Sequence, residues 1–198
     1  MPKVSEEHRE AMRRRIQDAA LACVGRKGFA AASMADIVAE AGLSAGAVYV
    51  YYKGKEQLTV DVGRRVLEDR LAALALVEGL DPVPPPHEVI PEIMAGLPKT
   101  AFFPGIALQV WGEAVHNAEL AGIAQSIIGE VTGRFAEYLQ AWLESSRGLS
   151  RDEARAEAER LAPSVVGLVQ GYILQVAFVG GGIEERYLES ARALLEGL

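Results

Sequence analysis

The sequence predicts an all-α protein of about nine helices, with a small N-terminal domain followed by a larger helical one. Apolar residues recur at spacings of three and four through most of the 198-residue chain, which is the period of an amphipathic helix. Half of the residues are apolar, so packed cores are expected rather than disorder. Proline- and glycine-rich segments separate the periodic stretches and mark where helices end.

The first predicted helix covers residues 5–28, where Ile16 begins an apolar stripe at helical spacing. The basic cluster Arg13–Arg15 fits either a solvated helix surface or contacts with phosphate, and the sequence leaves both open. Cys23, the single cysteine, cannot form an intramolecular disulfide bond. Its place on an apolar helix favours a buried hydrophobic role over a redox-sensitive one.

Residues 33–55 predict two short helices around a tight turn, followed by the start of a longer helix. Ser33 and Asp36 have the spacing of a capping box, in which two side chains satisfy the free amides of a helix start. Gly42 tolerates the left-handed conformation that ends a helix, and Ser44 is suited to cap the next one. Such a pair of helices is the helix-turn-helix pattern, whose second helix enters the DNA major groove.

The stretch from Arg13 to Leu58 resembles the amino-terminal domain of TetR-family transcriptional regulators. It follows the pattern AAL…KGF…S-x-x-DI…AEAG-[VL]-S-x-G-x-[VL]-Y-x-Y-[FY]…KE-x-L nearly in full. The resemblance implies a helix-turn-helix DNA-binding domain at residues 1–53 and a helical ligand-binding and dimerisation domain at residues 54–198. Two positions depart from the pattern, because Ala45 stands where the family often has lysine and Val50 where it often has histidine.

The resemblance and the motif together place eight residues at the DNA: Ser33, Ser44, Ala45, Gly46, Tyr49, Val50, Tyr51 and Lys55. The hydroxyl and ammonium groups are expected to hold phosphates, and the small residues are expected to face bases. Lys55 is the strongest phosphate candidate, since a lysine in the first turn opposes the helix dipole unless an anion is bound there. Small apolar residues at the bases predict recognition through thymine methyl groups and DNA shape.

The net charge of −7 is unevenly distributed along the chain. Residues 1–55 carry nine Lys or Arg against six Asp or Glu, a balance of +3, and the remainder carries −10. A weakly basic head on an acidic body fits a protein that meets DNA with one end only.

After the helix-turn-helix, the periodicity predicts a long helix at residues 55–77 that joins the DNA-binding domain to the body. The segment DPVPPP at residues 81–86 interrupts the helical pattern, because proline removes amide donors. Further helices are predicted at residues 87–97, 105–117, 118–147, 151–179 and 183–197.

The helix at residues 151–179 is apolar on both sides over its second half, so it must be buried on both sides. Burial against the same helix of a second chain is expected, in a four-helix bundle with the last helix. The predicted homodimer interface comprises Leu161, Val165, Leu168, Gly171, Tyr172, Val176 and Leu194. The apolar run is too short for the roughly 18 residues of a membrane span, so no membrane partner is expected.

Large aromatic residues with a few amides predict a ligand cavity among the middle helices. Its expected lining is Phe102, Phe103, Gln109, Trp111, His116, Tyr138, Trp142, Gln170, Gln175 and Phe178. A solid core is the alternative, and the resemblance favours the cavity because family members typically release DNA on binding a small molecule. The acidic body disfavours anions, so an apolar or amphipathic effector is expected.

Catalysis is not expected. The three histidines are scattered, and the sequence contains no metal-ligand spacing, glycine-rich phosphate loop or nucleophile elbow, so no catalytic residue, metal or cofactor is predicted. The charged N-terminus argues against a secretory signal, which predicts a cytoplasmic protein. The favoured hypothesis is a ligand-responsive DNA-binding repressor acting on a palindromic operator. The alternative is an all-helical small-molecule-binding or enzymatic module with a vestigial DNA-binding head.

Overall fold

A computed structural model describes residues 6–97, 102–180 and 182–198, with the side chains of residues 64, 66–71, 73, 102 and 103 outside that description. These residues form nine helices: α1 (Glu6–Lys27), α2 (Met34–Ala41), α3 (Ala45–Tyr49), α4 (Lys55–Glu78), α5 (Pro86–Ala95), α6 (Phe102–Ala114), α7 (Ala118–Arg147), α8 (Arg151–Val179) and α9 (Ile183–Leu195). The all-α prediction is confirmed. α7 and α8 have their predicted bounds, and α1, α4, α5, α6 and α9 differ from theirs by at most three residues at either end.

The chain divides into two compact units. The N-terminal unit comprises Met1–Arg65 with Gly105–Ala124, and the C-terminal unit comprises Val66–Pro104 with Gln125–Leu198. The predicted division at residues 53 and 54 is different, because it assigns all of α4, α6 and α7 to the body. In the structure Leu58 of α4 and Leu120 of α7 are buried in the same hydrophobic cluster as Ile16 of α1.

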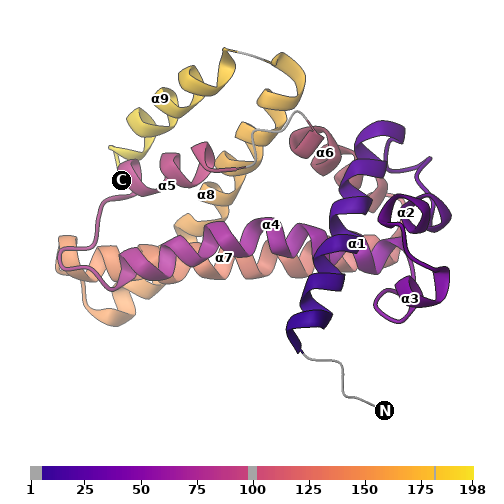
Figure 1. Cartoon of the computed structure of the whole chain (residues 1–198). Helices are drawn as coiled ribbons and strands as arrows, with labels where there is room; N and C mark the ends of the chain where they lie inside the picture. The colour runs from indigo at the N-terminus through magenta and orange to yellow at the C-terminus, as the bar shows by residue number, and fades with distance from the viewer. Residues whose placement is uncertain (1–5, 98–101, 181) are drawn as a thin grey trace. The chain divides into compact units, whose positions relative to one another are not determined.

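The N-terminal unit is built around α1, which packs against α2 (Figure 1). Its core also contains a polar connection between three parts of the chain. Gln17 Nε2 donates a hydrogen bond to the Tyr52 hydroxyl at 3.1 Å, and that hydroxyl donates to Asp61 Oδ2 at 3.1 Å. Burial raises the pKa of Tyr52 to about 12, so the hydroxyl stays protonated and keeps its donor. This connection ties α1, the segment after α3 and α4 together.

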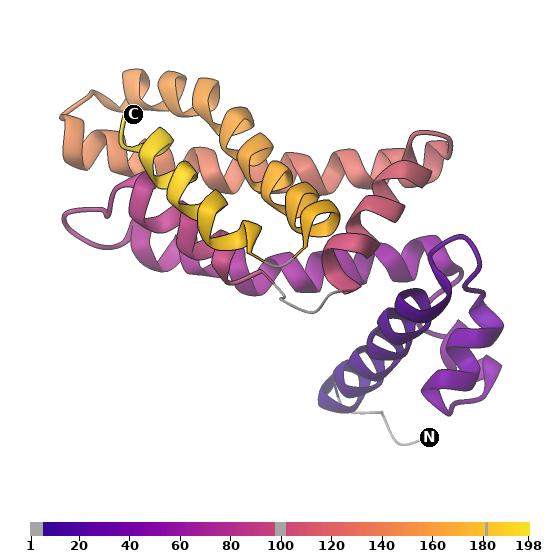
Figure 2. The ribbon, with the colours of Figure 1, turned by 90° about the horizontal axis from the view of Figure 1, so that it is seen from above.

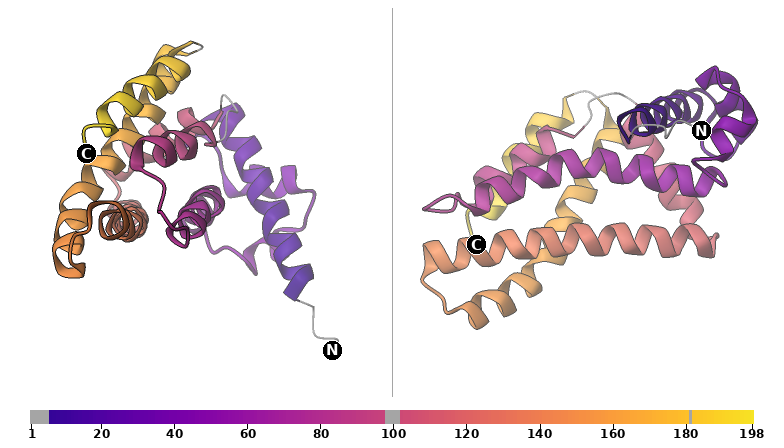
Figure 3. Two further views of the ribbon diagram at one scale, coloured as in Figure 1. Left: turned by 90° about the vertical axis from the view of Figure 1, so that its left-hand side faces the viewer. Right: turned by 60° about the horizontal axis from the view of Figure 1, so that its bottom comes forward.

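The C-terminal unit packs α9 against both α5 and α8, as Figures 2 and 3 show from different sides. Phe135, Tyr138 and Leu139 of α7 are fully buried in its core. The Tyr138 hydroxyl donates to the Pro84 carbonyl at 2.7 Å, and Ser145 Oγ accepts from the Val83 amide at 3.2 Å. These two bonds attach the proline-rich connection to α7.

α8 begins at a capping box of Ser150 and Glu153 and continues through Pro163. By length and composition α8 is apolar enough to cross a membrane, with an 18-residue window of mean hydropathy 1.6, so the prediction that its apolar run is too short is wrong. Only 33% of this window is buried inside the protein, with Val166 and Ile173 among its buried residues. A core helix passes the same composition test, so this property is weak evidence for a membrane.

Gly171 on α8 permits a close approach of α9 within the same chain. A Cβ atom on Gly171 would lie 2.5 Å from the Tyr187 hydroxyl oxygen, and that hydroxyl donates to the Leu168 carbonyl at 2.9 Å. The rings of Tyr172 and Tyr187 are 5.6 Å apart. In the single chain Tyr187 lies against this glycine, and the contact of Gly171 with a second chain that the sequence predicts stays a prediction.

Candidate nucleic-acid interface

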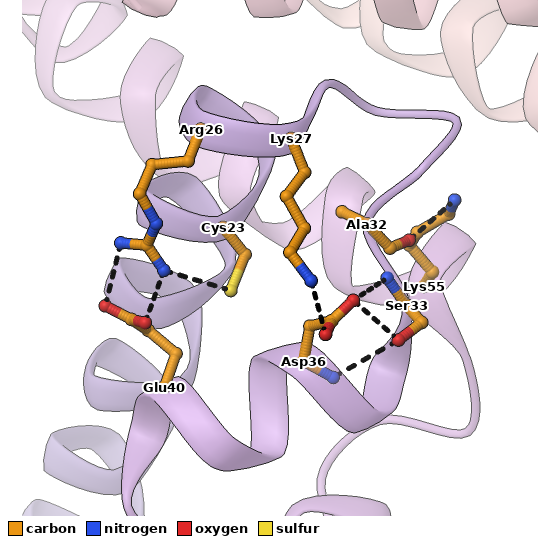
Figure 4. A network of polar contacts seen from close by, with 8 residues as sticks. All are labelled: Cys23, Arg26, Lys27, Ala32, Ser33, Asp36, Glu40 and Lys55. Atoms are coloured by element: carbon orange, nitrogen blue, oxygen red, sulfur yellow. Dashed lines mark hydrogen bonds and ion pairs between the residues drawn. The ribbon is translucent and has the colours of Figure 1, made fainter.

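The start of α2 is fixed by a capping box and an ion pair (Figure 4). The Ser33 amide donates to Asp36 Oδ2 at 3.1 Å, and the Asp36 amide donates to Ser33 Oγ at 3.2 Å. Lys27 at the end of α1 lies 2.7 Å from Asp36 Oδ1. The bonds from Lys27 and Ser33 stabilise the carboxylate and lower the pKa of Asp36 from 3.8 to about 2. The capping box predicted from the sequence is confirmed.

Two arginines of α1 hold the rest of α2. Arg26 makes a bidentate pair with Glu40, at 3.2 and 2.5 Å (Figure 4). Arg15 donates to the carbonyls of Ala41 at 2.8 Å and Gly42 at 3.3 Å, which satisfies acceptors at the end of the helix. Gly42 has a φ of 61°, the left-handed conformation that the sequence predicts.

Cys23 lies inside this α1–α2 arrangement. It is buried, and burial raises the pKa of its thiol, which disfavours the reactive thiolate. The structure therefore agrees with the hydrophobic role that its place on an apolar helix suggests.

α3 turns a small, largely apolar surface outward. Ser44 Oγ accepts from the Ala47 amide at 3.2 Å and caps the helix, while Val48 is fully buried. Ala45 and Gly46 are exposed on the outer side. The side chains of Tyr49 and Val50 are 49% and 81% exposed. A Cβ atom at Gly46 would meet no neighbouring heavy atom of the described residues within 4 Å.

Lys55 makes its contacts inside the N-terminal unit. Its ammonium group donates to the carbonyls of Phe29 at 2.8 Å and Ala32 at 3.1 Å and lies 4.4 Å from the centroid of the Phe29 ring. Ser33, the other polar group predicted at phosphate on this side, donates its hydroxyl to Asp36 Oδ2 at 2.8 Å. Both side chains thus have structural partners, and their contacts with phosphate stay predictions.

Lys53 and Tyr51 differ in their availability to DNA. Lys53 is exposed, and in the described part of the chain its ammonium group has no ion-pair partner. Tyr51 is half-buried against the core of the N-terminal unit. Lys53 was not among the predicted DNA contacts. Its position about one helical turn after the recognition helix could have indicated such a contact from the sequence alone.

The predicted ligand residues of the C-terminal unit do not have a common environment. Tyr138 and Trp142 are buried, and Arg147 lies 5.5 Å from the Trp142 ring. Phe178, in contrast, is 77% exposed, Gln175 is also exposed, and Gln170 is half-buried. The side chains of Phe102 and Phe103 lie outside the described residues. Tyr138 and Trp142 therefore serve as core residues, as the solid-core alternative expects.

The remaining predicted ligand residues belong to the N-terminal unit. Trp111 is half-buried, His116 is exposed, and Gln109 accepts a hydrogen bond from the Phe29 amide at 2.5 Å. Two open grooves occur in the described residues, one of about 910 Å³ along α1 and one of about 590 Å³ between α7 and α8. None of the residues predicted to bind ligand lines either groove.

Residues predicted at the homodimer interface also have different environments in the single chain. Val165 and Tyr172 are already buried within the C-terminal unit, and Leu161, Leu168 and Val176 are half-buried. Leu194 on α9 is exposed. The exposed apolar residues of α8 and α9 include Leu174, Phe178 and Val179 on α8 and Leu194 on α9.

The sequence of the helix-turn-helix segment matches a known protein family. Residues 16–62 match the sequence profile of "Bacterial regulatory proteins, tetR family". The chain carries the DNA-binding domain of the TetR family of transcriptional regulators. The family and the relatives of this chain are transcriptional regulators rather than enzymes.

Relatives within and beyond the helix-turn-helix are regulators of the same kind. The transcriptional repressor Rv1474c of Mycobacterium tuberculosis is 39% identical over 80 residues, which span 40% of this chain and 42% of that protein, less than half of its length. The transcriptional regulator BetI of Agrobacterium fabrum is 29% identical over 198 residues, covering 99% of this chain and 89% of that one.

The fold of the whole chain is also that of solved transcriptional regulators. A putative regulator from Saccharomonospora viridis, solved in complex with choline, has a TM-score of 0.68 at 19% identity, covering 94% of this chain and 96% of that one. At this identity the likeness concerns the fold alone.

Proposed function

We propose that this TetR-family regulator is a repressor that binds a two-fold symmetric operator as a homodimer and leaves it when a small molecule binds. The exposed face of α3 carries the proposal. Ala45, Gly46 and Val50 are directed away from the core while buried Val48 anchors the helix. Residues without a structural partner on a rigidly held helix are suited to contact bases. Their small apolar character favours thymine methyl groups and DNA shape over hydrogen-bonded readout.

Dimerisation is proposed through the exposed apolar residues of α8 and α9. Leu174 and Phe178 are exposed one helical turn apart, and Leu194 of α9 is 66% exposed. Exposed apolar groups of this size are rare on a monomer and common at interfaces. A symmetric dimer presents two recognition helices to two half-sites, which requires a palindromic operator. Such a protein acts on chromosomal DNA, so a cytoplasmic location is proposed.

The effector is proposed to be an apolar or amphipathic molecule that is not an anion. The chain outside residues 1–55 has a balance of −10, which attracts cations and repels anions. The Saccharomonospora viridis neighbour was solved with choline, so choline is a first molecule to test. Coupling in regulated proteins is typically about 1–3 kcal/mol, so an effector should weaken operator binding roughly 5- to 150-fold.

The decisive experiment is selection of bound duplexes from a random DNA pool, followed by affinity measurement at several salt concentrations. The expected product is a palindrome. Val50→Glu should abolish its binding by placing a carboxylate at the bases, and Val115→Glu is the matched control. Val115 is 75% exposed, like Val50, and lies beyond the end of α6. Recovery of no enriched sequence would support the alternative, a small-molecule-binding module with a vestigial DNA-binding head.

The dimer and the effector are tested separately. Phe178→Arg should yield monomers in sedimentation at micromolar concentration and weaken operator binding, while Ile128→Arg on α7 should remain dimeric. A dimeric Phe178→Arg protein would place the interface elsewhere. For the effector, operator affinity is measured with and without saturating choline and any compound that raises the melting temperature. Equal affinities with a bound compound would contradict release by that compound.

A further inference from the structure

The two peptide groups of one loop residue are held by side chains from two different helices. Gln109 Oε1 on α6 accepts the amide hydrogen of Phe29 at 2.5 Å. Lys55 Nζ on α4 donates to the Phe29 carbonyl at 2.8 Å and to the Ala32 carbonyl at 3.1 Å. Backbone groups outside helices need such partners when they are partly buried. The loop at residues 28–32, which connects α1 to α2, is therefore fixed from both sides.

Gly28 shows that the approach of Gln109 to this loop is tight. Its φ of 82° lies in the left-handed region, which glycine adopts without steric cost. A Cβ atom at Gly28 would lie 3.2 Å from Gln109 Oε1, closer than most real contacts. A side chain at residue 28 would thus be unfavourable in conformation and would also crowd the accepting oxygen.

The loop leads directly into the helix-turn-helix. The Ala32 carbonyl, which Lys55 holds, precedes Ser33, and Ser33 caps α2. α2 in turn packs against α3, the helix with the exposed recognition face. A displacement of Phe29 therefore moves the start of α2 and, through it, α3.

We propose that Gln109 is a positioning residue for DNA binding, which fixes the loop 28–32 and with it the start of the helix-turn-helix. The inference rests on the proposed operator binding. α6 starts at Phe102 in the C-terminal unit, while the part that carries Gln109 belongs to the N-terminal unit. A helix rises about 1.5 Å per residue, so a shift of α6 by a single residue breaks a 2.5 Å hydrogen bond. Gln109 thereby connects α6 to the loop that precedes the DNA-binding helices within the N-terminal unit.

The test compares three full-length variants. Gln109→Leu removes the acceptor, Gln109→Glu keeps an acceptor oxygen, and Gln125→Leu is the same change at an exposed glutamine of α7. Hydrogen–deuterium exchange of the segment 28–32, the melting temperature and the affinity for the duplex selected by the wild-type protein are measured for each. Gln109→Leu should speed exchange of the Phe29 amide and weaken operator binding about 2- to 10-fold, the value of one hydrogen bond. Gln109→Glu should keep the exchange of the Phe29 amide and the operator affinity close to those of the wild-type protein. Gln125→Leu should change neither the exchange nor the affinity.

Several results would overturn the inference. Unchanged exchange at Phe29 in Gln109→Leu would show that the hydrogen bond does not hold the loop. Faster exchange with unchanged operator affinity would show that the loop does not position the recognition helix. A Gln109→Glu protein that behaves like the leucine variant would also contradict the role of the acceptor. If the wild-type protein selects no duplex, the proposed function itself fails, whereas equal binding by wild type and Gln109→Leu removes only the role of Gln109.

Discussion

The N-terminal unit and the C-terminal unit are each stabilised internally by a different kind of interaction. The N-terminal unit uses short elements joined by polar contacts, such as Lys27 with Asp36 and Arg26 with Glu40. The C-terminal unit relies on long helices with apolar cores, where Phe135 and Leu139 are fully buried. Short helices bury little apolar surface, so specific side-chain contacts must define their arrangement.

This difference explains where the family pattern lies in the sequence. Many residues of the pattern in the N-terminal unit, including Lys55 and Ser33, serve contacts within the protein. Among the outward residues at α3, Ala45 and Val50 differ from the residues that the family often has, whereas Gly46 and Tyr49 match the pattern. Part of the pattern therefore encodes the geometry of the DNA-binding head, and part of it lies on the exposed surface of α3.

The largest expected effects come from deleting core volume in one unit at a time. Ile37 and Leu139 are both fully buried, one in each unit. Ile37→Ala and Leu139→Ala should each lower the free energy of unfolding by about 2–5 kcal/mol. Hydrogen–deuterium exchange should rise mainly in residues 6–65 for the first and in residues 125–198 for the second. Equal loss of protection across both units in either variant would show that the two cores unfold together.

An intermediate effect is expected from the two lysines beside the recognition helix. Lys55→Ala should lower the free energy of unfolding by about 1–3 kcal/mol, because it removes charged hydrogen bonds to two carbonyls. Its operator affinity should fall without a change in salt dependence. Lys53→Ala should leave stability unchanged and reduce the slope of log affinity against log salt by about 1.8, the contribution of two phosphates, because each protomer of the proposed dimer loses one contact. A reduced slope in Lys55→Ala would assign the phosphate contact to Lys55 instead.

The smallest effect concerns the two capping boxes, one in each unit. In folded protein the pKa of Asp36 is lowered to about 2, first by Lys27 and then by Ser33, and the pKa of Glu153 is lowered by Ser150 alone. A lowered pKa stabilises the fold above the unfolded value of 3.8, and this stabilisation is lost as pH falls toward 2. Asp36→Asn should therefore remove more of the acid dependence of the melting temperature between pH 4 and 2 than Glu153→Gln. The reverse order would show that the ion pair with Lys27 is screened away in solution.

Local sequence signals predicted the helices and their caps well. Ser33 with Asp36 and Gly42 act over three to six residues, so their chemistry is visible in the sequence itself. The helix periodicity placed α7 and α8 at their observed ends. Gln17 shares helical spacing with the apolar residues Ala20 and Val24, so the sequence already indicated a buried polar side chain. It did not indicate that Tyr52 is its hydrogen-bond partner.

Contacts between distant residues could not be predicted in this way. Gln109 and Phe29 are 80 residues apart, and nothing in the periodicity of α6 distinguishes a ligand anchor from a backbone acceptor. The same holds for Gly171, whose close neighbour Tyr187 lies on another helix. Aromatic residues such as Tyr138 and Phe178 looked equivalent in sequence, yet one is in the core and the other is exposed. Composition identifies apolar residues, while the packing of helices decides which of them are covered.

The open space at Gly46 has an evolutionary consequence. Because an added Cβ atom there meets no neighbouring heavy atom of the described residues within 4 Å, larger side chains can arise without disturbing the core. Ala45 and Val50 are exposed on the same short segment, so their replacement also leaves the internal contacts intact. Under the proposed role of these three positions in contacting bases, duplicated genes that diverge there acquire new operators while keeping one stable DNA-binding domain. Regulators of this architecture can therefore specialise through few substitutions, and each intermediate remains a folded protein.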